Sequence, residues 1–212
     1  MELQVKDISG KVIGSVDADD SVWGAEPNMA LLHQAVVTQL ANRRQGTHDT
    51  LTRAEVSYST RKLRAQKHTG RARLGSRKSP AMRGGGVAHG PHPRSYNKSL
   101  PKKMRQEALR VALADHVRSE SLTVVDAIKL DSPKTRAIKD MVQAFELKGR
   151  ALIVTADKDD LLLKSCANIQ GVQVREARNL SAVETVSAPN LVITRDAVNI
   201  VNTMWGKGPE AK

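Results

Sequence analysis

Aromatic residues and cysteine are scarce in this chain. Its 212 residues include one Phe, two Tyr, two Trp and a single cysteine, Cys166. One cysteine excludes an intramolecular disulfide and a metal cluster built from several thiolates. The core must therefore be aliphatic, and we expect Cys166 to be a small core residue because it stands in an apolar helical pattern. No apolar run reaches the length of a membrane span and no signal-peptide pattern follows Met1, so we expect no membrane partner and a reducing cytosol.

Acidic residues are almost missing from the stretch between residues 42 and 105. These 64 residues hold 17 Lys/Arg and 2 Asp/Glu, a net charge of +15. The whole chain has 34 Lys/Arg and 22 Asp/Glu, which leaves 17 basic and 20 acidic residues elsewhere, a net charge of −3. A segment so cationic and so poor in apolar residues repels itself and cannot build a core alone. Nucleic acid is the first polyanion to consider as its partner.

The sequence outside this stretch alternates between short apolar runs and helical patterns. Uniformly apolar strands separated by helices are typical of a parallel sheet covered on both faces. We therefore predict an α/β fold, a Rossmann-like three-layer body with a mostly parallel sheet, interrupted by a long extended basic loop. The predicted parts are a globular body over 1–42 and 101–206, a basic RNA-binding arm over 43–100, and a C-terminal tail over 207–212.

The body elements are predicted from periodicity and capping residues. A β-hairpin is expected around Ser9 to Lys11, between strands 3–5 and 12–16. Further strands are expected at 122–125, 151–154, 172–174 and 191–193. Helices are expected from the caps Asn28, Ser132-Pro133 and Thr194, from Asp159 and Ser181 as helix starts, and from Pro101 as the first helical residue. On the inner faces of the helices we expect Leu40, Ala137, Leu161 and Met204 among others, and on the outer face of the helix after Pro101 we expect Lys102, Lys103, Arg105 and Arg110.

The arm carries residue types that suit RNA. Arg bridges phosphate oxygens and stacks on bases, while Lys acts as a compact charge. Gln66 and Thr69 can reach phosphates, bases or 2′-hydroxyls, and Tyr58 and Tyr96 can each stack on an unpaired base. The predicted RNA-binding residues are Arg43, Arg44, Arg53, Arg61, Lys62, Arg64, Gln66, Lys67, Thr69, Arg71, Arg73, Arg77, Lys78, Arg83, Arg94, Tyr96, Lys98, Lys102, Lys103 and Arg105.

Other kinds of site are poorly supported. The glycines from Gly84 to Gly90 neither follow a strand nor open a helix, as a dinucleotide fingerprint requires. His89 and His92 lack a third ligand nearby in the sequence, and His33 and His116 fit structural roles within helices. A Rossmann-like enzyme would need catalytic groups at the carboxyl ends of its strands, where Asp126, Thr155 and Thr194 are isolated. We predict no catalytic residue, no metal and no cofactor.

An ordered series of short motifs gives the chain a family resemblance. They include Arg44-Gln45-Gly46-Thr47, the run from Gln66 to Arg73, Arg83 to Val87, and Leu100 to Lys103, followed by Ser132 to Thr135 and Leu191 to Thr194. Over nearly its full length the chain resembles the bacterial-type family of large-subunit ribosomal protein four. The basic insertion stands where that family has its arm.

The resemblance implies a function beyond what composition indicates. Members bind 23S-type rRNA early in assembly, beside other large-subunit proteins, with the body on the solvent side of the subunit. Their arm threads through rRNA and lines part of the exit tunnel used by the nascent polypeptide. The tunnel-facing tip should lie at about 61–73. Carried over to this chain, the residues nearest the lumen are Arg64, Gln66, Lys67, His68, Thr69, Gly70 and Arg71.

The chain departs from the family pattern at several arm positions. His68 stands where the family usually has Gly, and His89 where it usually has Phe. Leu63 and Met82 lie near positions that are usually aromatic. A regulator that binds mRNA is the alternative from a different class, and a Rossmann-like enzyme is a more distant one.

Overall fold

The structure, a computed structural model, describes residues 1–128, 130, 132–147 and 149–206. The expected tail at 207–212 lies outside the described residues. Contacts divide the chain into two compact units, one of Met1–Leu40 together with the chain from Ser99 on, and one of Ala41–Lys98. Each division falls two residues before the boundary expected from the sequence. The first unit is the α/β body and the second is the arm.

A six-stranded sheet forms the centre of the body. The strands are β1 (Glu2–Lys6), β2 (Val12–Asp17), β3 (Leu122–Val125), β4 (Ala151–Thr155), β5 (Val172–Glu176) and β6 (Asn190–Thr194). Their order is β2-β1-β3-β6-β4-β5. Only the β1–β2 hairpin is antiparallel, and every other neighbouring pair is parallel. The predicted mostly parallel sheet is confirmed.

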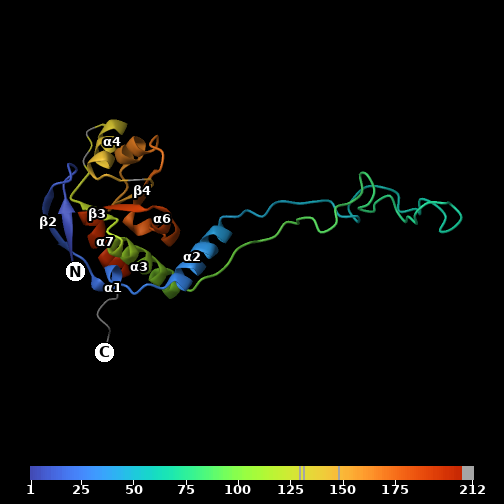
Figure 1. Ribbon diagram of the computed structural model, residues 1–212, viewed down its shortest axis with the longest axis horizontal. Coiled ribbons are helices and arrows are strands. Elements are labelled where there is room, and N and C mark those ends of the chain that lie inside the picture. Colours follow the sequence, from blue (N-terminus) through green and yellow to red (C-terminus); the bar gives the residue numbers. More distant parts are fainter. Residues whose placement is uncertain (129, 131, 148, 207–212) are drawn as a thin grey trace, which may run out of the picture. The chain divides into compact units, whose positions relative to one another are not determined.

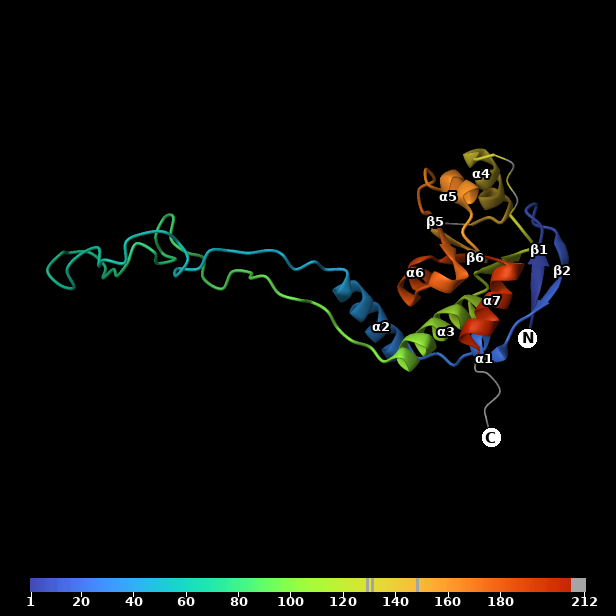
Figure 2. The ribbon, with the colours of Figure 1, turned by 180° about the vertical axis from the view of Figure 1, so that it is seen from behind.

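Helices cover both faces of the sheet. The helices are α1 (Asp20–Trp23), α2 (Met29–Asn42), α3 (Lys102–Arg118), α4 (Thr135–Ala144), α5 (Asp160–Cys166), α6 (Ala182–Ser187) and α7 (Arg195–Trp205), with a 3-10 turn at Ala177–Asn179. One apolar cluster joins α4 and α5 to the sheet, and another joins α1, α3 and α7 to it. Figures 1 and 2 show these two groups on opposite sides of the strands. The body therefore has the predicted three layers.

The central strands are apolar because each one faces two helical layers. Leu191 and Ile193 of β6 pack in the cluster of α3 and α7, whereas Val192 between them packs with α4 and α5. Successive side chains of a strand point to opposite faces, so an entirely apolar run serves both layers. A third cluster places Leu32 and Ala35 of α2 against Ala108 and Ala112 of α3.

The capping residues predicted from the sequence are partly correct. Asn28 accepts a hydrogen bond from a backbone N–H of the first helical turn, as predicted, and so do Asp159 and Ser181, which were predicted as helix starts and not as caps. Thr194 occupies the N-cap of α7 without such a bond. Pro101 is the N-cap of α3 rather than its first residue, and Lys134, not Ser132-Pro133, caps α4. The helix boundaries therefore shift by one to two residues, and no element is lost.

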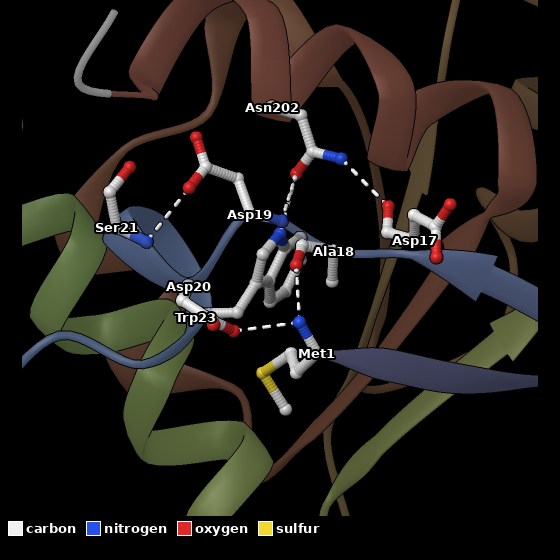
Figure 3. A network of polar contacts seen from close by, with 8 residues as sticks. All are labelled: Met1, Asp17, Ala18, Asp19, Asp20, Ser21, Trp23 and Asn202. Carbon is white, nitrogen blue, oxygen red and sulfur yellow. Dashed lines mark hydrogen bonds and ion pairs between the residues drawn. The ribbon is translucent and has the colours of Figure 1, made fainter. Parts of the chain in front are cut away.

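One short helix was not predicted. Trp23 of α1 is fully buried, and its indole N–H donates to Asn202 Oδ1 of α7 at 2.9 Å. Figure 3 shows Asn202 also accepting from Asp19 and donating to the Asp17 carbonyl oxygen. The Met1 amino group donates to Asp20 and to the Ala18 carbonyl oxygen. A single amide of α7 thus fixes the segment that follows β2, a role that periodicity does not reveal.

Some predicted helix faces were wrong. Leu40, Leu161, Met204 and Ala137 are exposed rather than on inner faces. Arg110 is buried instead of facing solvent, and its Nε donates to the Trp205 carbonyl oxygen at 2.6 Å. Its Nη1 also pairs with Glu107 at 2.9 Å. The reason is that α7 packs against this side of α3, so the guanidinium satisfies the last carbonyls of a neighbouring helix.

Candidate RNA interface

The arm, residues 41–98, is a hairpin of two irregular limbs. We call 41–60 the outgoing limb, 61–73 the tip and 74–98 the returning limb. The two limbs run alongside each other in both views (Figures 1 and 2). The arm contains no helix beyond the last residues of α2 and no strand. Its path is therefore set by individual contacts between the limbs.

Hydrogen bonds connect the limbs at intervals along their length. Asn42 exchanges two bonds with the Lys98 backbone, at 2.7 and 3.0 Å. Further out, backbone N–H groups of Arg94 and Val87 donate across the hairpin to the carbonyl oxygens of Gly46 and Leu51. Near the tip, Ser76 Oγ donates to the Ser59 carbonyl oxygen. The contacts pair residues that are up to 56 apart in sequence, which gives the arm one defined register.

The arm has almost no buried surface. Gly86 is its one buried residue, and Leu51, Tyr58, Leu63 and Val87 are exposed large side chains. None of the three apolar clusters of the described residues includes a residue from 41–98. Surface hydrogen bonds without apolar burial contribute little net stability in water. This matches the prediction that the segment cannot build a core by itself.

Both acidic residues of the arm are used inside it. Asp49 Oδ1 lies 3.0 Å from His92 Nδ1 across the hairpin and also accepts from the Thr50 N–H. Glu55 Oε2 accepts from the N–H and the hydroxyl of Thr52 at 2.7 and 2.8 Å. These bonds, that of the N–H first, lower the pKa of Glu55 below its ordinary value. The two carboxylates shape the arm, so the basic side chains stay available for a partner.

The predicted RNA-binding residues are largely at the surface. Arg64, Lys78 and Tyr96 are half-buried, and all others in the arm are exposed, as are Lys102, Lys103 and Arg105 at the start of α3. Apart from the pair of Asp49 with His92, no ion pair among the described residues involves the arm. The arm therefore presents many cations without carboxylate partners, which is the electrostatic signature of a nucleic-acid surface.

The two tyrosines of the arm have cationic neighbours. The Arg44 and Arg94 Cζ atoms lie 3.7 and 4.4 Å from the centre of the Tyr96 ring. Arg77 lies 5.4 Å from the Tyr58 ring centre. At Tyr96, two guanidinium groups thus lie close to the ring on which a base was expected to stack.

The tip carries a hollow lined by polar residues. Its volume is about 300 Å³, and its lining comprises Thr60, Lys62, Gln66, Arg73, Leu74, Gly75 and Ser76. Within it Lys62 Nζ donates to Gln66 Oε1 at 2.5 Å, and the Leu63 N–H donates to the Gly75 carbonyl oxygen nearby. His68 has φ of 64° and Gly70 has φ of 62°. His68 thus adopts a left-handed conformation in which a glycine would be strain-free.

The alternative sites considered from the sequence gain no support. The segment from Gly84 to Gly90 neither directly follows a strand nor directly precedes a helix. No group of three potential metal ligands occurs among the described residues. At the strand ends, Asp126 approaches Arg195 at 3.8 Å, and Thr155 Oγ1 donates to a backbone carbonyl oxygen. His116 is buried and hydrogen-bonded to Ser121 and the Thr185 carbonyl oxygen, whereas His33 is exposed.

Cys166 behaves as the sequence predicts. It is buried in the cluster beneath α4 and α5. Burial raises the pKa of its thiol to about 11, which leaves little thiolate near neutral pH. No described helix is both long and apolar enough to cross a membrane.

Sequence reasoning missed several residues whose contacts shape the arm. Gly46, His48, Asp49 and Glu55 were not singled out, although Asp49 and Glu55 are the only acids in a strongly basic segment. That rarity was an available signal, since isolated carboxylates among many cations are expected to have specific partners. Gly46 gave a weaker signal, because it lies in one of the short family motifs.

An α/β fold that carries a cationic hairpin is typical of a protein that binds a polyanion. Residues 16–204 match the model of the ribosomal protein L4/L1 family. The chain is 50% identical to the large ribosomal subunit protein uL4 of Symbiobacterium thermophilum over 197 residues, covering 93% of this chain and 95% of the relative. It is 47% identical to the protein of the same name from Heliobacterium modesticaldum, covering 92% and 95%. For the one from Dehalococcoides mccartyi strain 195 the identity is 42%, covering 98% and 99%.

The chain therefore belongs to the ribosomal protein L4/L1 family. Membership confirms the resemblance inferred from the motifs and identifies a structural ribosomal protein that is not an enzyme, cytoplasmic as part of the ribosome.

Proposed function

We propose that this chain is a structural constituent of the large ribosomal subunit that binds 23S-type rRNA early in assembly through its arm. The observation that carries the proposal is the hairpin of 41–98, which presents 14 Lys/Arg and only 2 Asp/Glu, both carboxylates being used internally. Neutralising RNA phosphates with these cations releases counterions and makes the affinity depend on salt. The names of the relatives place them in the large subunit, which supports the same location here. Neighbouring large-subunit proteins are further partners.

The division of labour between body and arm is part of the proposal. The body has its own aliphatic core, so it does not need RNA to fold. The arm lacks a core and gains its contacts from RNA, at an entropic cost that the many phosphate contacts offset. Lys102, Lys103 and Arg105 add basic contacts from the first turns of α3.

The proposal is tested by removing most of the arm. Replacing 47–93 with a short Gly-Ser linker exploits the hydrogen bond between the Arg94 N–H and the Gly46 carbonyl oxygen, which brings the two ends together. We expect the variant to keep a cooperative thermal transition and to bind a large-subunit rRNA transcript at least 100-fold more weakly, with a much smaller dependence on salt. Binding as tight as that of the full chain would overturn the assignment of the arm as the main anchor.

The tip is proposed to line the nascent-peptide exit tunnel. Lys67, Thr69 and Arg71 are exposed at the end of the hairpin, where a polypeptide can meet them without disturbing the contacts between the limbs. A photo-reactive amino acid at position 67 of ribosome-incorporated protein should cross-link to a stalled nascent chain. The same group at position 53, on the outgoing limb, should cross-link to rRNA alone. Equal nascent-chain labelling from both positions would contradict a tip that lines the tunnel.

A further inference from the structure

Tyr96 gathers cationic side chains from both limbs at one point of the arm. Arg44 comes from the outgoing limb and Arg94 from the returning limb, and their Cζ atoms lie 3.7 and 4.4 Å from the ring centre. The two Cζ atoms are thus at most 8.1 Å apart, the sum of these distances. His48 adds a third basic group, since its Nε2 lies 3.3 Å from the Tyr96 hydroxyl oxygen. Residues about 50 positions apart in sequence are brought to one ring.

The backbone at this point is built for close approach. Gly46 has φ of +70°, and a Cβ there would collide with the Arg94 carbonyl oxygen and lie 3.2 Å from two atoms of the Tyr96 ring. The Arg94 N–H also donates to the Gly46 carbonyl oxygen at 3.1 Å. Only glycine satisfies both the conformation and the space. The position of the two arginines is therefore set by the hairpin rather than by free side chains.

Nothing negative balances this cluster within the described chain. None of its ion pairs involves Arg44 or Arg94. The two acids of the arm are bound elsewhere, Asp49 to His92 and Glu55 to Thr52. Two guanidinium groups held over one ring repel each other, and cation–π attraction alone offsets that repulsion only in part.

We propose that Arg44, Arg94 and Tyr96 form a clamp for a single RNA phosphodiester. This inference rests on the proposed rRNA binding and assigns one site within it. The two free oxygens of a phosphodiester can each accept short hydrogen bonds, of about 2.7–2.9 Å, from one guanidinium group, which suits two guanidinium carbons that are at most 8.1 Å apart. Tyr96 contacts no RNA in this arrangement. It is a positioning residue that holds the two arginines at the spacing of one phosphate.

Salt dependence separates this clamp from base stacking. A ring that stacks on a base contributes affinity without displacing counterions, so its loss weakens binding at every salt concentration alike. A ring that positions two arginines affects phosphate neutralisation. Tyr96→Leu changes no charge. It should nevertheless make the negative slope of log affinity against log salt shallower by about 0.7–0.9, the value of one phosphate contact. It should also weaken binding to a large-subunit rRNA transcript by roughly 10-fold, as befits one lost charged contact.

Matched variants of the full chain complete the test. Tyr96→Phe retains the ring and should behave like the wild type. Arg44→Gln should match Tyr96→Leu, and the double variant should bind no more weakly than either single one. The control Arg71→Gln, at an exposed tip residue away from the cluster, should combine additively with Tyr96→Leu. The thermal transition of the body reports that all variants fold.

Each outcome decides the proposal. A reduced slope for Tyr96→Leu, together with non-additivity with Arg44→Gln, supports the clamp. An unchanged slope with weaker binding would indicate base stacking and overturn it, as would wild-type binding by Tyr96→Leu. Failure of the unmodified chain to bind the transcript would overturn the proposed function along with the clamp, whereas normal wild-type binding with unaffected variants would overturn the clamp alone.

Discussion

Individual side chains decide the structure of the arm because it has no core to do so. Glu55 is the sharpest case. Its carboxylate accepts from both the N–H and the hydroxyl of Thr52, closing a turn in the outgoing limb. Asp49 similarly joins His92 on the other limb. Although the arm holds 14 Lys/Arg, neither carboxylate forms an ion pair with one of them, and both bind neighbours that define the fold of the hairpin.

The turn at Glu55 predicts a pH dependence at residue scale. Hydrogen bonds from Thr52 lower the pKa of Glu55 in the folded arm. The contribution of these bonds is thus fully present above the ordinary pKa of a glutamate, and it is lost as the pH falls through the lowered value. Thr52→Val removes the hydroxyl donor and keeps the N–H, so we expect the pKa of Glu55 to rise part of the way towards its ordinary value.

Carbon-13 NMR of the Glu55 carboxyl group across an acid titration measures this shift. Thr50→Val is the matched control, since the Thr50 hydroxyl donates to the Pro91 carbonyl oxygen and not to Glu55. A pKa of Glu55 that is the same in the wild type and in Thr52→Val would show that the hydroxyl bond does not form in solution.

At the scale of elements, sequence and structure agree best where periodicity and burial coincide. The four strands β3 to β6 and their order along the chain were predictable, because a strand such as β4 is buried throughout, is apolar up to its last residue, Thr155, and lies between two helical layers. The faces of the helices were less predictable. Arg110 is buried because it serves the end of α7, and α1 forms because Trp23 meets Asn202 about 180 residues away. Such pairings depend on tertiary contacts that local patterns do not contain.

The candidate site was likewise predictable from the sequence only in part. The basic residues of the arm could be named from composition and family motifs, and most are exposed as expected. The register between the limbs could not, because irregular limbs have no period from which to derive it. The contacts of Gly46, His48 and Asp49 therefore come from the structure alone.

The limbs also approach each other closely at Gly86, which predicts an effect on the hairpin as an element. A Cβ at Gly86 would collide with the backbone nitrogen of Arg53. Gly86→Ala should force the limbs apart and lose the nearby bond from the Gly86 N–H to the Lys78 carbonyl oxygen. We expect roughly 10-fold weaker binding to a large-subunit rRNA transcript, on the order of 1.4 kcal/mol, with an unchanged thermal transition of the body.

Gly75→Ala is the control for this change. Gly75 also lies in the arm, its φ is not in the left-handed region, and a Cβ there meets nothing within 4 Å. It should bind RNA like the wild type. If Gly86→Ala and Gly75→Ala bind equally well, the close approach of the limbs does not matter for RNA recognition.

For the whole molecule, the contrast between body and arm becomes a difference in stability. In the body, β4 is buried along its entire length and hydrogen-bonded on both sides. In the arm, Gly86 alone is buried and the limbs meet through exposed hydrogen bonds. Local opening is easy where few apolar contacts are broken. One chain therefore combines a unit that folds by burial with a unit that has no apolar core of its own.

Hydrogen exchange tests this difference in the free and RNA-bound protein. Without RNA, the amides of Val87 and Arg94 should exchange far faster than those of Ile153 and Val154 in β4, even though all four donate hydrogen bonds. With a large-subunit rRNA transcript, the arm amides should become strongly protected, because opening then also requires loss of phosphate contacts. The β4 amides should stay slow in both states and serve as the internal reference. Protection of the arm in isolation that equals that of β4 would mean that the hairpin is stable by itself, and that RNA meets a preformed arm instead of ordering one.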